Sequence, residues 1–167
     1  MMFEAYIADL KRKFYSKEIF NIQDNVKIRG YNIIMISDVK EWNYFDGCRS
    51  FIYILNFDKY KIDLYSLKVF CNTLRHHTNR ILGTNRLLRL RAGVTIPLLV
   101  SEYEYPEPII KFVKNTKMFK LGDLCMPVLV DLSKGEVTTL EHFGFVGALP
   151  IRKKVKRIKQ DFSVDIA

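Results

Sequence analysis

Apolar residues recur along this chain at two different periods, and the changes of period divide it into elements. Near the beginning, Phe3, Ile7, Leu10 and Phe14 are three or four residues apart, which is the spacing of one helix face. A helix is therefore predicted over residues 2–15.

Three segments that follow are rich in β-branched and aromatic residues, which strands favour. Residues 21–25 are polar and predict a turn, and the alternation at 26–28 predicts the beginning of a short strand. Longer strands are predicted over 31–37 and 49–57, where isoleucine, phenylalanine and tyrosine lie close together.

Residues 65–82 have the pattern of a long amphipathic helix. Arg75, His76 and Arg80 fall on its polar side, and Gly83 follows its last turn, as glycine does at a helix C-cap. The apolar stripe predicted to face a core consists of Leu67, Phe70, Cys71, Leu74, Ile81 and Leu82.

The second half of the chain predicts further strands and one short helix. A strand is predicted over 94–100, and Pro97, which has no N–H to donate, should lie at a sheet edge, at a bulge or near the strand start. A helix over 109–113 and a hairpin over 126–140 follow. Strands that alternate with helices predict a single layered α/β domain over 1–150, with a mixed β-sheet flanked by helices.

The formal net charge of +9 is concentrated in two segments. Residues 75–97 carry five cations and no acid, and residues 152–167 carry six cations and two acids, whereas the other segments are nearly balanced. Localised positive charge favours an anionic partner such as nucleic acid, although a surplus that only keeps the protein soluble explains it equally well. The last segment, 151–167, is predicted to be a basic tail or a short helix.

The arginine-rich middle of the chain is suited to phosphate binding, because arginine pairs bidentately with phosphate oxygens and histidine adds hydrogen bonds. The alternative is an ordinary solvated helix face whose arginine stems cover leucine side chains. The residues predicted to contact nucleic acid are Arg75, His76, Arg80, Arg86, Arg89, Arg91, Arg152, Lys153, Lys154, Lys156 and Arg157.

Two acids follow predicted strands and could serve a metal-dependent reaction. Asp38 begins an acid–x–lysine pattern that Lys40 completes, and Asp58 comes directly after the next strand. Acids at neighbouring strand ends can bind a divalent ion that activates water for phosphodiester cleavage. The catalytic candidates are therefore Asp38, Lys40 and Asp58, with the two aspartates as metal ligands. The simpler alternative is that soluble proteins place charges at strand ends.

The order of a helix, acid-bearing strands, a helix and a strand resembles the restriction-endonuclease-like, or PD-(D/E)xK, nuclease superfamily over roughly residues 2–115. In that superfamily one acid ends a strand, and an acid and a lysine lie on the next. Asp38 would be the first acid, with Asn56-Phe57-Asp58 in the place of the second element; alternatively, Asp24 would be the first and Asp38-Val39-Lys40 the second. The resemblance implies a divergent or inactive nuclease-like domain, with Mg²⁺ as the cofactor if it is active.

A non-enzymatic oligomerising or adaptor protein is the alternative function. It is motivated by the edge-like hairpin at 126–140 and by the aromatic cluster of Trp42, Tyr44 and Phe45. The longest apolar runs are far shorter than the ~20 residues that span a bilayer. No transmembrane segment is therefore expected, and a cytoplasmic location is the default.

Overall fold

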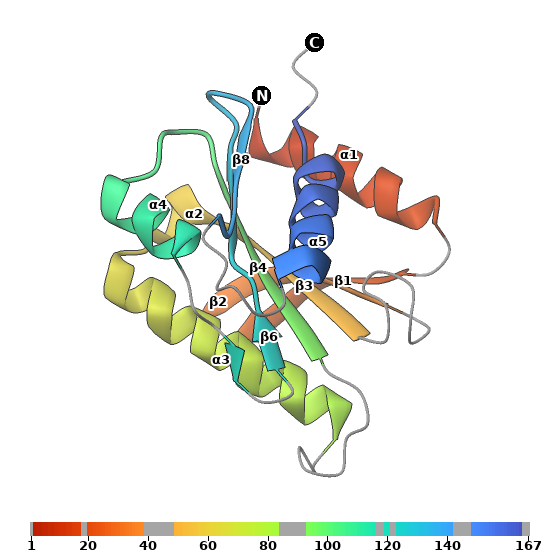
Figure 1. The fold of residues 1–167 in the computed structure, drawn as a ribbon. Helices are drawn as coiled ribbons and strands as arrows, with labels where there is room; N and C mark the ends of the chain where they lie inside the picture. The colour runs from red at the N-terminus through yellow and green to blue at the C-terminus, as the bar shows by residue number, and fades with distance from the viewer. Residues whose placement is uncertain are drawn as a thin grey trace.

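A mixed β-sheet of eight strands lies between two layers of helices (Figure 1). This computed structural model describes residues 2–17, 20–38, 49–83, 93–115, 119–120, 123–141 and 148–164. It confirms the predicted class, an α/β domain whose mixed sheet is flanked by helices. None of the helices within these ranges combines the length and the apolar composition that crossing a bilayer requires.

The elements follow the predicted order closely. The helices are α1 (Phe3–Tyr15), α2 (Phe57–Tyr60), α3 (Leu64–Leu82), α4 (Glu107–Lys114) and α5 (Ala148–Asp161). The strands are β1 (Phe20–Ile28), β2 (Tyr31–Asp38), β3 (Arg49–Asn56), β4 (Gly93–Ser101), β5 (Phe119–Lys120), β6 (Asp123–Cys125), β7 (Val128–Asp131) and β8 (Glu136–Thr138).

The parallel pair β3 and β4 forms the centre of the sheet. The two strands pair along their whole common length, from Arg49 opposite Gly93 to Asn56 opposite Val100. All nine residues of β4 are buried. Side chains along a strand point alternately to the two faces of the sheet, so burying all of them requires a layer of helices on each face.

Side chains of the central strands alternate between two separate cores. Ile52 and Ile54 of β3 pack with α1 and α5, whereas Phe51 and Tyr53 pack with α3 and α4. Figure 1 shows the same grouping, with α5 beside α1 and α3 beside α4. The helices α3 and α5 therefore lie on opposite faces of the sheet.

Residues 21–25 belong to strand β1, so the turn predicted there is wrong. The antiparallel pairing of β1 with β2 is interrupted by a bulge between Gln23 and Val26, and Asn25 has a φ of 58°. Asparagine tolerates this left-handed conformation better than most residues. β1 is also an edge strand of the sheet, and its polar residues can therefore remain in water while the backbone pairs on one side.

Pro97 lies inside a central strand and not at the sheet edge or the strand start. On the side away from β3, strand β4 pairs with β6 up to Thr95 and with β7 from Leu98. The same register carries through both pairings, so Pro97 stands opposite Pro127 in the gap between β6 and β7. A proline is tolerated here because the ladder is already interrupted at its position.

The last basic segment forms a packed helix and not a free tail. Ile158 and Phe162 are fully buried in the core that α1 shares. The hydroxyl of Tyr6 donates a hydrogen bond to the Phe162 carbonyl at 3.0 Å. The ammonium of Lys13 donates to the carbonyls of Gln160 and Asp161 at the end of α5. The apolar positions of α5 thus complete one face of the domain.

Replacing Ile158 with alanine should lower the free energy of unfolding by about 2–5 kcal/mol, because a buried isoleucine leaves a cavity. The matched control is Lys156→Ala on the exposed side of the same helix, which should change stability by less than about 0.5 kcal/mol. Urea denaturation of both variants measures the difference. Equal effects would show that α5 does not contribute to the core.

Candidate nucleic-acid interface

A groove of about 1010 Å³ runs between α3 and the turn that joins β1 to β2. Lys27 and Arg29 line it from the turn, and Asn72, His76 and Arg80 line it from α3. No carboxylate is present among the described residues of its lining. Helix α3 itself contains no aspartate or glutamate. The groove is therefore positively charged and rich in hydrogen-bond donors.

The turn that forms one wall of the groove is a two-residue hairpin. Ile28 pairs with Tyr31, and the two residues between them, Arg29 and Gly30, have φ values of 46° and 84°. Positive φ at both central positions is typical of a type I′ turn, which favours asparagine or aspartate followed by glycine. An arginine there is conformationally costly, and its side chain lines the groove.

Packing against α3 fixes this hairpin beside the groove. The ring of Tyr31 makes edge contacts with Phe70 on α3 and with Tyr60 on α2. The Tyr60 hydroxyl accepts a hydrogen bond from the Asn32 amide at 2.8 Å. The hairpin wall of the groove is therefore anchored to α2 and α3 by these aromatic contacts and by this hydrogen bond.

His77 connects the groove to a polar network in the core. Its Nδ1 lies 3.1 Å from the Tyr53 hydroxyl, which is 2.9 Å from the Thr78 hydroxyl. Thr95 donates to the same Thr78 oxygen at 2.9 Å. If these hydrogen bonds are donated in one direction, from Thr95 to Thr78, then to Tyr53 and then to the ring, His77 accepts at Nδ1 and its proton is on Nε2.

Burial shifts the pKa of both titratable side chains in this network, Tyr53 and His77. The pKa of Tyr53 is raised by burial, so its hydroxyl stays protonated. The pKa of His77 is lowered, first by burial and then by the charge of Arg80. His77 is half-buried and lines the groove. At neutral pH it is therefore a neutral hydrogen-bond donor and not a cation.

Arg75 does not lie on the exposed face that the sequence predicted. It is buried, with 7% of its surface exposed, and it faces the sheet together with Leu74 and Thr78. One helical turn separates Arg75 from Cys71, which is also buried, so both occupy the same inward side of α3. Ile81, predicted to be buried, is 40% exposed near the end of the helix. His76 and Arg80 are exposed and line the groove, as an exposed polar face requires.

Both carboxylate oxygens of Asp58 are hydrogen-bonded within the fold. Its two oxygens accept hydrogen bonds from the Ser101 hydroxyl at 2.6 Å and from the Glu102 amide at 2.7 Å. The carboxylate thus ties the first turn of α2 to the end of β4. Among the described residues, no three histidine, cysteine, aspartate or glutamate side chains are grouped as a metal site would need.

The structure also separates Asp58 from Asp38. Asp38 ends β2, and its neighbour Ser37 pairs with Phe51 near the beginning of β3. Asp58 follows the other end of β3, beyond Asn56. Five residues of strand span about 17 Å, so the two aspartates cannot share one ion. The sequence placed both aspartates at strand ends, but it did not reveal that β2 runs antiparallel to β3, which puts the two aspartates at opposite ends of β3.

The remaining predicted residues fall into two groups. Lys40, Arg86, Arg89 and Arg91 lie outside the described residues. The others belong to α5, on the face of the sheet opposite to α3: Arg152, Lys153, Lys154, Lys156 and Arg157. Of these, Arg157 forms an ion pair with Asp161 at 3.6 Å.

Sequence reasoning missed Lys27 and Arg29, because their segment is balanced in charge overall. The available signal was Arg29-Gly30 between two strand-like segments, which indicates a tight hairpin. Comparisons of the chain with protein-family models, curated proteins and solved structures found no match. The site must therefore be interpreted from its own geometry.

His77→Gln should lower the free energy of unfolding most at pH 7.5 and less at pH 5.5. The native pKa of His77 is lowered, so the unfolded chain takes up this proton first as the pH falls below about 6.5, and the stability that the neutral ring supplies is lost. Above that pH the variant should lose about 1 kcal/mol, the contribution of one hydrogen bond. Urea denaturation across this range measures it, and a pH-independent difference would contradict the assignment.

Arg29→Asn should raise the free energy of unfolding by about 1 kcal/mol, because asparagine adopts positive φ at lower cost. The matched control is Lys27→Asn, which removes the same charge from the same wall of the groove at a residue whose φ is not positive. Thermal denaturation of both variants measures the difference. An equal rise in melting temperature for both would assign the effect to charge repulsion and not to backbone strain.

Proposed function

We propose that this protein binds nucleic acid through the groove between α3 and the β1–β2 turn. The observation that carries the proposal is the lining of this groove: Lys27, Arg29 and Arg80 supply positive charge, and no acid is present among its described lining residues. Within the described ranges, none of these three cations has a carboxylate partner. Their charge is therefore available to neutralise phosphates.

The other groups in the groove suit contacts along a sugar–phosphate backbone. Asn72 and His76 are exposed, and His77 offers a neutral N–H donor. Such side chains commonly contact phosphate and sugar oxygens, which fixes the position of a strand without reading its sequence. We therefore propose binding that depends strongly on salt and weakly on base sequence.

The order of elements supports a nuclease-like origin for the domain. A helix, three strands, a helix and a strand are here α1, β1 to β3, α3 and β4, with the short α2 inserted before α3. Apart from α2, this is the order that the resemblance to the PD-(D/E)xK superfamily implies. Asp38 and Asp58 are at opposite ends of β3, and β3 itself contains no acid or lysine. The proposed activity is accordingly binding, without cleavage by these two aspartates.

The test is a salt titration of binding to short duplex and single-stranded DNA and RNA. Arg80→Gln should weaken binding about three- to tenfold at low salt, and it should reduce the slope of log K against log salt by about 0.9, the share of one phosphate contact. Lys68→Gln is the matched control, because Lys68 lies on the same helix and packs over the ring of Phe112, away from the groove.

Three outcomes of this titration are informative. Equal effects of Arg80→Gln and Lys68→Gln would show that only net charge matters and that the groove is not the site. No binding of any nucleic acid at low salt would overturn the proposal. Cleavage of the oligonucleotides with Mg²⁺ or Mn²⁺ that Asp58→Asn leaves unchanged would place a nuclease centre elsewhere in the chain.

A further inference from the structure

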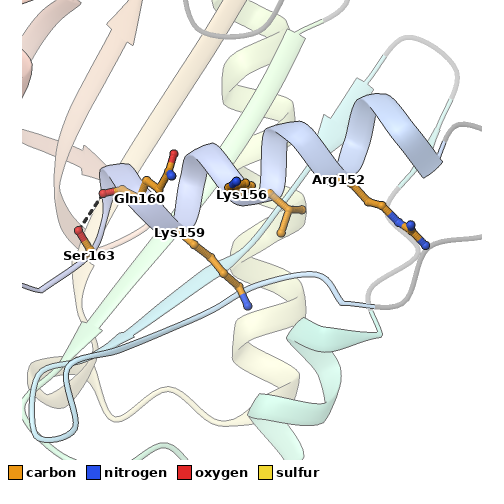
Figure 2. A pocket seen from close by; sticks show the side chains of 6 residues that line it. Arg152, Lys156, Lys159, Gln160 and Ser163 are labelled. Carbon is orange, nitrogen blue, oxygen red and sulfur yellow. Dashed lines mark hydrogen bonds between the residues drawn. The ribbon is translucent and has the colours of Figure 1, made fainter.

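Helix α5 presents a second cationic surface, which is separate from the groove beside α3. It carries six cations against one acid. Arg152, Lys156 and Lys159 line one hollow of about 530 Å³ along this helix, with Gln160 and Ser163 at its far end. Figure 2 shows Arg152 and Lys159 extending from the same side of the helix. Residues four apart are neighbours on a helix surface, so these cations form one continuous row.

Most of the charge in this row is not neutralised. Lys159 shares Glu141 with Lys114, at 3.7 Å and 3.2 Å respectively. Arg152 and Lys156 are exposed, and neither has a carboxylate partner within the described ranges. The helix that carries the row is anchored by its buried apolar side and by the hydrogen bonds from Lys13 to its last carbonyls.

The position of α5 excludes a single continuous interface with the groove. Val155 and Ile158 pack into the core that faces α1, whereas α3 packs into the core on the other side of the sheet. Two helices of about 10 Å diameter and the sheet therefore separate the two surfaces. This exceeds the screening length of about 8 Å at physiological salt, so each surface attracts its own segment of a ligand.

The chemistry of the row favours nucleic acid over a membrane. An amphipathic helix binds a bilayer by inserting its apolar face between the lipids. At the described apolar positions of α5 that face is already buried, since Val155 is 8% exposed and Ile158 and the adjoining Phe162 have no exposed surface. Apart from the nearly buried Val155, the described side chains that line the hollow are cationic or polar. Such a surface suits a polyanion bound through its phosphates.

We infer that α5 is a second phosphate-binding surface, and that one molecule of this protein holds two nucleic-acid segments on opposite faces of its sheet. The inference rests on the proposed function of the groove. Its consequence is a bridging activity: the protein joins two separate strands or duplexes, or two distant segments of one molecule, which a single groove cannot do.

The test is a capture experiment with the full chain. A biotinylated duplex is fixed on beads, and a second, fluorescent duplex is captured only if the protein bridges the two. The double variant Arg152→Gln/Lys156→Gln should still bind the fixed duplex but capture on the order of tenfold less of the second one. Arg80→Gln should likewise reduce the capture, and Lys68→Gln should not. Circular dichroism verifies that each variant is folded.

The pattern of variants separates the two proposals. If the wild type binds the fixed duplex without capturing the second one, and only Arg80→Gln removes that binding, the second surface is overturned and the groove remains the site. Binding lost through the α5 variant alone overturns the groove and makes α5 the single site. If light scattering shows a dimer and the α5 variant still captures the second duplex, dimerisation explains bridging and the inference fails. Binding of the wild type to phosphatidylserine vesicles that the α5 variant loses would assign the row to a membrane and overturn it too.

Discussion

The pairing of β3 with β4 is the constraint on which the rest of the structure depends. Both strands lie in the interior, and β4 is buried from end to end. Parallel strands need a crossover, and α3 supplies it on one face. The opposite face must then be covered by helices that come from the two ends of the chain, α1 and α5. The locations of the groove beside α3 and of the cationic row on α5 follow from this division.

Much of the fold could be predicted because burial determines it through simple periods. The spacing of Phe3, Ile7 and Leu10 indicated α1, and the β-branched segments indicated β2, β3 and β4. The boundaries of α3 were also clear, since its apolar stripe ends one residue before Gly83. These patterns are local, so they can be recognised without knowledge of contacts between distant segments.

What could not be predicted depends on contacts between distant segments. Arg75 has the charge of a surface residue, yet its position on α3 places it against the sheet. The separation of Asp38 from Asp58 follows from the antiparallel direction of β2 relative to β3, which no spacing in the sequence reveals. The groove depends on a hairpin that folds beside a helix some 40 residues later, so Lys27 and Arg29 gave no signal that linked them to Arg80.

The opposed prolines of β4 and of the gap between β6 and β7 have a consequence for how the sheet assembles. A slip of one residue in this register would turn Val128 and Val130 from the α5 core toward α3, and it would place each proline opposite a residue that needs a partner. In the native register Pro97 and Pro127 stand opposite each other, where the ladder on this side of β4 is interrupted between β6 and β7. The two prolines therefore penalise misaligned strands during folding, because neither can donate a backbone hydrogen bond.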